Sequence, residues 1–190
     1  MAADRIIEIP EPKIARFFFA DTRMAWLWLF VRLYVAYEWV MAGWEKVTSP
    51  VWAGAQAGQA LNGFLAGALQ QTTGAHPNVS GWYAFFIGAV VIPHVAFFSC
   101  LVSYGELAVG IALTFGVLTG VAAFFGAFMN INYLFAGALS VNPLLLLLEI
   151  FLMLAWRIAG WWGIDRWLLP ELGVPWGPGR LFQSRSSAKA

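Results

Sequence analysis

Four apolar stretches dominate this chain of 190 residues, at about residues 24–44, 95–116, 120–138 and 144–162. Each is close to the length of roughly 20 residues that an α-helix needs to cross the apolar part of a membrane. Of all residues, 61% are hydrophobic and 11% are charged, whereas a soluble domain carries about 25% charged residues. We therefore expect an all-α fold, an integral membrane four-helix bundle formed by residues 24–165.

The long segment 47–93, between the first two stretches, is nearly free of charge. Within it, residues 51–71 are rich in Ala and Gly with interspersed amide side chains, a pattern that indicates a weakly amphipathic helix at the membrane surface. Residues 72–80 are predicted to form a loop, and the apolar stretch 82–92 is too short to span alone. The segment is therefore predicted to be an interfacial or re-entrant helical insertion. A competing interpretation merges residues 82–102 into a fifth span.

Basic residues gather at the two ends of the chain, before the first apolar stretch and after the last. They are Arg5, Lys13, Arg16, Arg23, Arg166, Arg180, Arg185 and Lys189. Because lysine and arginine favour the cytoplasmic side of a membrane, residues 1–23 and 166–190 are predicted to be cytoplasmic. An even number of spans agrees with this orientation, and a fifth span would place one basic end outside.

The rarer residue types argue against several classes of function. Cys100 is the only cysteine, so the chain can form neither an internal disulfide nor a CxxC redox pair. The two histidines, His76 and His94, are poorly arranged to hold a haem, and neither a phosphate-binding glycine loop nor a hydrolase motif occurs. The net charge of +1 provides no basic surface for nucleic acid. We expect no metal site and no cofactor held by a recognisable motif.

Five charged residues lie inside the apolar stretches: Arg32, Glu38, Glu106, Glu149 and Arg157. An ionisable side chain at this depth costs about 2.5–3.5 kcal/mol on insertion scales, so it usually pairs, faces the protein interior or lines a path. A rise of about 1.5 Å per residue puts Glu106 near mid-membrane, Glu38 and Glu149 in the outer half, and both arginines in the inner half. These residues are candidates for a functional site, although ion pairs can also simply hold helices together.

The simplest electrostatic arrangement pairs Glu106 with one of the two arginines. Glu38 and Glu149 then have no cation at their own depth, apart from Lys46 and His94 at the rim. A carboxylic acid without a cation in a low-dielectric site tends to stay protonated, and it can then donate a hydrogen bond or exchange a proton. We therefore expect Glu38, Glu106 and Glu149 to face one polar cavity.

In this hypothesis Glu106 and Glu38 are the catalytic, proton-exchanging groups. The residues predicted to bind a substrate or a quinone are Arg32, Asn130, Asn132, Glu149 and His94. Asn130 and Asn132 could instead form hydrogen bonds between helices, as amide side chains often do in membranes.

Several short motifs occur in an order and spacing that resembles one protein family. They are Gly43–Lys46, Ser103–Gly110, Phe128–Tyr133 and Trp156–Arg166. From about residue 26 to residue 176 the chain is similar to the DoxX-like and DoxD-like proteins, which are small four-helix integral membrane proteins of bacteria and archaea.

The resemblance implies a subunit of a quinone-linked respiratory, thiol or sulfur oxidoreductase system in the bacterial plasma membrane. The matching polar residues are Arg32, Lys46, Glu106 and Asp165, and family-motif or structural roles fall on Gly43, Lys46, Gly105, Arg157 and Asp165. A single cysteine makes dithiol chemistry within this chain doubtful. Electrons would have to come from a membrane or peripheral redox partner, and a quinone would be the cofactor.

Three functions remain open on the sequence, and whether the chain is itself an enzyme is not decided. The first is the quinone-linked subunit. The second is a non-catalytic anchor or scaffold of a larger membrane complex, including a homo-oligomer, in which the buried charges only fix helix register. The third is a small proton-coupled transporter or lipid-handling protein, which the absence of an inverted repeat weakens.

Overall fold

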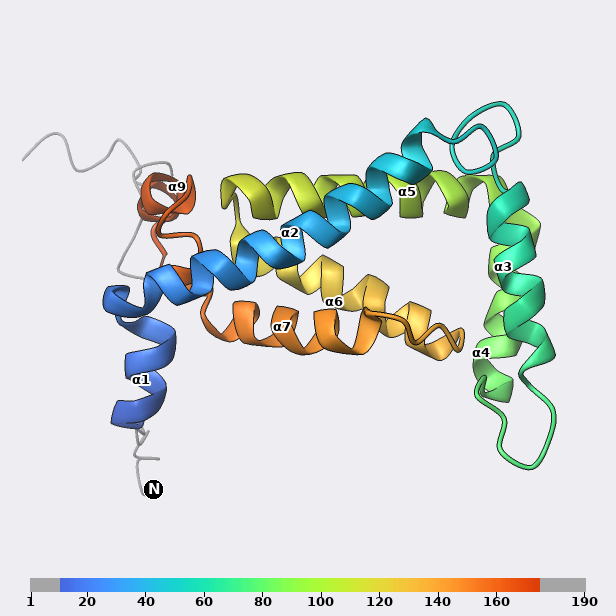
Figure 1. Ribbon diagram of the computed structural model, residues 1–190, viewed down its shortest axis with the longest axis horizontal. Helices are drawn as coiled ribbons and strands as arrows, with labels where there is room; N and C mark the ends of the chain where they lie inside the picture. The colour runs from blue at the N-terminus through green and yellow to red at the C-terminus, as the bar shows by residue number, and fades with distance from the viewer. Residues whose placement is uncertain (1–10, 175–190) are drawn as a thin grey trace, which may run out of the picture.

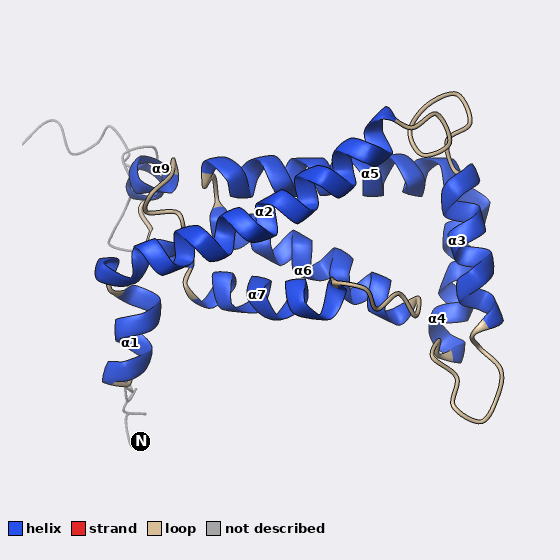
Figure 2. Ribbon diagram, in the orientation of Figure 1, coloured by secondary structure: helices blue, strands red, loops and turns tan. Residues whose placement is uncertain are grey.

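The structure, a computed structural model, describes residues 11–174, and these residues form helices, turns and loops without any strand (Figure 2). Four helices run side by side along the long axis: α2 (Ala25–Thr48), α5 (Val95–Phe115), α6 (Thr119–Phe135) and α7 (Asn142–Leu154) (Figure 1). Both α2 and α6 pack against α5 and against α7, so the four helices form a closed ring. The prediction of an all-α fold is confirmed.

Shorter helices lie at the two ends of this bundle (Figure 1). α1 (Lys13–Ala20) and α9 (Asp165–Leu172) lie at one end, where a short α8 (Trp156–Ala159) follows α7. α3 (Gln59–Gln70) and α4 (Gly81–Phe86) lie at the other end. The first and last described parts of the chain are therefore at the same end of the bundle.

The helical stretch from α4 to α5 is bent. A π-helical turn, η2 (Ile87–Val91), and a 3-10 turn, η3 (Ile92–His94), connect the two helices. Pro93 lacks an N–H group and clashes with the preceding turn, which bends a helix. The Nδ1 atom of His94 lies 3.1 Å from the carbonyl oxygen of Val90. As a result, α4 runs beside α3 across the end of the bundle and does not continue along the axis of α5 (Figure 1).

The helices lie close to the predicted stretches in three of four cases. α2, α5 and α6 correspond to residues 24–44, 95–116 and 120–138. The fourth stretch, 144–162, is interrupted, because α7 ends at Leu154 and Ala155 has a φ of −87° and a ψ of 13°. The predicted cytoplasmic tail begins with α9, and residues 1–10 and 175–190 lie outside the described residues.

Within the insertion 47–93, the helix is shorter than predicted. Helix occupies only Gln59–Gln70 of the predicted range 51–71, and turns precede it. Gly58 has a φ of +97°, and a Cβ there would lie 2.9 Å from the backbone nitrogen of Ala96. A glycine is needed at this left-handed position, and it separates the turns from α3.

Length and composition identify one stretch in residues 11–174 that could cross a membrane, Gly81–Phe115. It includes the bend at Pro93, and α6 and α7 are shorter apolar helices. α2 has 24 residues, but it includes Arg32 and Glu38. These criteria alone give weak support for a membrane and do not establish four spans.

The buried apolar side chains form two clusters. The bundle cluster fills the space between the four long helices; its largest members are Trp28, Val35, Trp39, Leu113, Leu145, Leu152 and Ile158. The end cluster joins α3, α4 and η2 to the end of α6; its largest members are Leu61, Leu65, Tyr83, Ile87 and Val91. The two clusters meet along α5 and α6.

Glycines allow a close approach of α2 and α5. A Cβ on Gly110 would lie 2.6 Å from the backbone nitrogen of Val40, and one on Gly43 would meet the backbone of Leu107. Small residues of this kind let helix backbones pack directly. The contact fixes the register of the two helices and therefore the side chains that meet across them.

Candidate functional site

A partly buried ion pair joins the last turn of α2 to α5. The Nζ atom of Lys46 lies 2.6 Å from Oε2 of Glu106, and the hydroxyl of Tyr133 donates a hydrogen bond to Oε1. The side chain of Glu106 is 1% exposed, whereas that of Lys46 is 19% exposed. One carboxylate therefore connects a partly exposed lysine to a tyrosine on α6.

The loop after α2 holds the lysine in place. The ammonium group of Lys46 lies over the ring of Trp52, 5.3 Å from its centroid. The hydroxyl of Ser99, on α5, donates to the carbonyl oxygen of Trp52 at 2.6 Å. A cation over an aromatic face is attracted by the ring quadrupole, so the loop both covers and stabilises the lysine.

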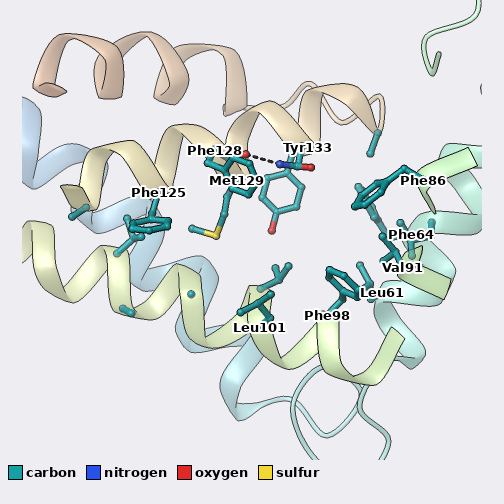
Figure 3. A pocket seen from close by; sticks show the side chains of 18 of the residues that line it. Leu61, Phe64, Phe86, Val91, Phe98, Leu101, Phe125, Phe128, Met129 and Tyr133 are labelled. Atoms are coloured by element: carbon teal, nitrogen blue, oxygen red, sulfur yellow. Dashed lines mark hydrogen bonds between the residues drawn. The ribbon is translucent and has the colours of Figure 1, made fainter. Parts of the chain in front are cut away.

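A cavity of about 610 Å³ lies where the two apolar clusters meet, between α5, α6 and the α3–α4 end of the molecule (Figure 3). Small residues on α5 leave the space open, namely Gly105, Ala108 and Ala112. Among the lining side chains, Tyr83, Asn132 and Tyr133 carry hydroxyl or amide groups, and the others are apolar. The volume is in the range of pockets that bind small organic ligands.

Tyr133 connects the cavity to the ion pair. Its ring lines the cavity and extends from α6 toward α5 (Figure 3), while its hydroxyl donates to Glu106. At the α4 side of the cavity, the hydroxyl of Tyr83 donates to the backbone oxygen of Asn132 at 3.0 Å and to Oδ1 at 3.1 Å. The cavity is thus a half-open apolar pocket, with exposed side chains such as Leu101 and Phe125 at its rim and a few polar groups on its wall, one of them bonded to a buried charge.

Glu149 occupies a second buried polar position, inside the bundle. Its two carboxyl oxygens accept hydrogen bonds from Nε1 of Trp39 at 2.6 Å and from Nδ2 of Asn130 at 2.7 Å. No cation contacts this carboxyl group within residues 11–174, as the sequence indicated. The Oδ1 atom of Asn130 is buried and has no hydrogen-bond partner in the described structure. Gly126 leaves room for the carboxyl group, since a Cβ there would overlap Oε1.

Arg32 and Asp165 stabilise the turn between α5 and α6. Arg32 donates to the carbonyl oxygens of Leu113 at 3.0 Å and Trp162 at 3.1 Å. Asp165 accepts from the backbone nitrogens of Leu118 at 2.6 Å and Thr119 at 2.8 Å. Leu118 has a φ of 46°, an unfavourable conformation for a leucine, and the Asp165 carboxylate stabilises it.

Several predicted interactions are wrong. Glu106 does not pair with an arginine, because Lys46 reaches it instead. Arg157 pairs with Glu11 at 3.1 Å on the surface. The physical reason is register: the glycine contact between α2 and α5 brings the last turn of α2 against Glu106, while Arg32 lies near the opposite end of α5, at Leu113.

The prediction of one polar cavity shared by three glutamates is also wrong. Glu38, Glu106 and Glu149 do not line the cavity, and its wall is mainly apolar. Glu38 is half-buried on α2, next to Trp39, and it forms no ion pair among the described residues. Glu106 and Glu149 have separate sets of partners, because they project from different helices at different levels of the bundle.

The remaining predicted binding residues are dispersed. Asn132 lines the cavity, whereas Arg32, Asn130 and Glu149 lie away from its wall. His94 is exposed and contacts the carbonyl oxygen of Val90 in its own helical stretch. It lies at the bend and does not line the cavity.

Sequence reasoning missed the aromatic partners of the buried carboxylates. Tyr133 and Trp39 donate to Glu106 and Glu149, respectively. A signal was available on α6, where Tyr133 lies three residues after Asn130 and hence on the same helix face. Among so many aromatic residues, this spacing did not distinguish Tyr133.

Comparison of the chain with protein-family models, with curated proteins and with solved structures found no match. The resemblance to DoxX-like proteins therefore has no support from these comparisons. Within residues 11–174, no group of three or more His, Cys, Asp or Glu side chains is arranged to hold a metal ion.

Proposed function

We propose that the chain is a four-span integral membrane protein, with α2, α5, α6 and the α7–α8 stretch as its spans. Lengths support this, because 24 residues in α2 and 21 in α5 correspond to about 36 and 32 Å, close to the roughly 30 Å hydrocarbon core. α7 and α8 together extend from Asn142 to Ala159. The short break at Ala155 is buried in the bundle, where irregular backbone is tolerated in a membrane.

The distribution of side chains supports the same proposal. Between residues 47 and 154 the only formally charged residues are Glu106 and Glu149, and both are buried. The exposed faces of α5, α6 and α7 are apolar; on α5 they include Phe97, Leu101, Ile111 and Phe115. Apolar surfaces on this scale mark contact with a membrane or another protein.

The proposed orientation places both termini in the cytoplasm of a bacterium, with α3 and α4 at the outer surface of the plasma membrane. α1 and α9 lie at the same end of the bundle (Figure 1), and basic residues accompany them: Lys13, Arg16, Arg23 and Arg166. The bend at Pro93 directs α4 across the opposite end, as an interfacial helix would run.

Within the membrane, we propose that the cavity binds a quinone-type lipid and that the chain is a subunit of a quinone-linked oxidoreductase system. The supporting observation is the combination of an apolar cavity of about 610 Å³ with the Tyr133–Glu106–Lys46 chain at its wall. A half-open apolar pocket suits a prenyl or alkyl tail, and a charged hydrogen-bonded chain suits a polar head group. Lys46 is partly exposed, so protons could pass between the head group and water through Glu106.

The resemblance to DoxX-like proteins fits this proposal at the level of single residues. Gly43 sets the contact of α2 with α5, Lys46 and Glu106 form the ion pair, and Gly105 lines the cavity. Asp165 stabilises the α5–α6 turn. Electrons would be exchanged with a redox protein that binds this chain, in the membrane or at its surface.

A binding titration tests the proposal. A decyl-substituted 1,4-benzoquinone is titrated into the purified protein in detergent while the intrinsic tryptophan fluorescence is recorded. We expect saturable binding, and we expect Ala108→Phe to weaken it by narrowing the cavity. Ala66→Phe is the matched control, because Ala66 is exposed on α3 and does not line the cavity. Binding that is absent, or that is unaffected by Ala108→Phe, would reject the proposal and favour a scaffold.

A second candidate is a lipid-handling protein, favoured by the nearly apolar wall of the cavity. A phospholipid labelled on one acyl chain would then compete with the benzoquinone for the same site. Competition lost in Ala108→Phe would identify a general lipid site.

A further inference from the structure

The hydrogen-bond direction at Tyr133 determines which form of a ligand fits this cavity. A tyrosine hydroxyl has one hydrogen to donate and can also accept. At Tyr133 this hydrogen is donated to Oε1 of Glu106. The other oxygen of Glu106 faces the ammonium group of Lys46 at 2.6 Å, and a lysine ammonium can only donate. The ion pair therefore keeps Glu106 as the acceptor and Tyr133 as the donor.

The consequence is that Tyr133 presents only acceptor capacity to the cavity. The same holds for Tyr83, whose hydroxyl hydrogen is donated to Asn132. The sulfur of Met129 also lies on the wall (Figure 3), and a thioether is a weak acceptor. Of the polar side chains lining the cavity, Asn132 alone keeps an uncommitted hydrogen, on the amide nitrogen that already donates to Phe128 at 2.8 Å.

We propose that the cavity selects the reduced, hydroxyl-bearing form of a quinone-type lipid, with a head-group hydroxyl donating to the hydroxyl oxygen of Tyr133. This inference rests on the proposed quinone site and adds its redox preference. A quinone carbonyl can only accept, so it would meet the lone pairs of Tyr133 without a hydrogen between them. In a low-dielectric cavity an unmatched polar pair is unfavourable.

Selection of the reduced form also has an electrochemical consequence. Binding that favours the hydroquinone over the quinone raises the midpoint potential of the bound two-electron couple, by about 30 mV for each tenfold preference. The bound hydroquinone would then be a weaker electron donor than the free hydroquinone.

The test compares three ligands that share one tail: a decyl-substituted 1,4-benzoquinone, its hydroquinone, and the dimethyl ether of that hydroquinone. Their dissociation constants are measured by calorimetry under anaerobic conditions on the full-length protein. We expect the hydroquinone to bind about tenfold more tightly than the other two, since one matched hydrogen bond contributes about this factor. The dimethyl ether is decisive, because it has the reduced ring but no hydrogen to donate.

Two variants assign the preference to Tyr133. Tyr133→Phe should weaken hydroquinone binding about tenfold and should not weaken quinone binding, so that the preference for the hydroquinone is lost. Tyr104→Phe is the matched control, because Tyr104 is exposed on α5 and does not line the cavity. Gel filtration and helical circular dichroism show that each variant is folded, and the comparison of ligands on the unmodified protein stands without any variant.

The outcomes separate this inference from the proposed function. Equal binding of the three ligands, tighter binding of the quinone, or an unchanged preference in Tyr133→Phe would overturn the inference and leave a quinone site in place. Saturable binding of none of the three ligands would overturn the proposed function and this inference together.

Discussion

Lys46 and Glu106 are 60 residues apart in the sequence, yet their Nζ and Oε2 atoms lie 2.6 Å apart. The pair is asymmetric, because the glutamate is 1% exposed and the lysine 19% exposed. Losing the lysine therefore leaves a charge that cannot reach water, whereas losing the glutamate leaves one that can. This asymmetry makes the pair testable by stability measurements.

Lys46→Met should lower the free energy of unfolding by about 3–5 kcal/mol, because it leaves a buried carboxylate without its cation. Glu106→Gln should cost less, about 1–3 kcal/mol, since the lysine can turn toward water. The double variant should cost less than the sum of the two single variants. Unfolding of the protein in detergent, followed by circular dichroism, measures all three. Additive effects, or a larger loss for Glu106→Gln than for Lys46→Met, would contradict this reading.

Gly110→Ala should force α2 and α5 apart, because its Cβ would lie 2.6 Å from the backbone nitrogen of Val40. We expect a loss of about 1–3 kcal/mol, as for overpacking in other cores. Gly67→Ala is the control on α3, where no atom lies within 4 Å of the added Cβ, and it should stabilise the helix by about 0.5–1 kcal/mol. Thermal unfolding of both variants should show shifts of opposite sign.

Asp165→Ala should destabilise the α5–α6 turn, since two backbone N–H groups lose their acceptor. A lost cap of this kind costs about 1–2 kcal/mol, and the positive φ of Leu118 loses its compensation. Asp21→Ala removes an exposed aspartate that accepts from the backbone nitrogen of Arg23 at 2.9 Å, and it should cost less. Hydrogen exchange at the backbone amides of residues 116–119 provides a local readout, which Asp165→Ala should accelerate and Asp21→Ala should not.

Glu149→Gln should be tolerated, with a change of less than about 1 kcal/mol. Its oxygen can still accept from Trp39, and its amide can donate to the unpartnered Oδ1 of Asn130 after that side chain flips. Glu149→Leu should cost about 3 kcal/mol, because it leaves two buried donors without acceptors. Equal stability of the two variants in chemical denaturation would show that the hydrogen bonds contribute nothing.

Single-cysteine labelling tests the membrane topology, with Cys100→Ala as the background. A membrane-impermeant maleimide should label Thr73→Cys and Ser140→Cys in intact cells. It should label Arg166→Cys only after permeabilisation. All three positions are exposed. Labelling of Thr73→Cys and Ser140→Cys from opposite sides would contradict the four-span arrangement.

The long apolar stretches and the composition of the chain predicted the helical class and the positions of α2, α5 and α6. The fourth stretch was predicted too long, since hydropathy does not register the break at Ala155. The candidate site was predicted in part: Glu106 and Glu149 are buried as expected. The residues that bind these two carboxylates were not predicted correctly. His94 and Glu38 contact neither of them.

The sequence by itself determined where α2, α5 and α6 lie, and it indicated that charges within them such as Arg32 and Glu106 would be buried, because these properties depend on local composition. Only the tertiary structure decided which buried groups meet. That outcome depends on the register of α2 against α5, set by backbone contact at Gly43 and Gly110. The cavity likewise lies where the two apolar clusters meet, because the small residues Gly105 and Ala108 leave space unfilled there. This packing depends on contacts between side chains that are far apart in the sequence, and these contacts form only in the folded protein.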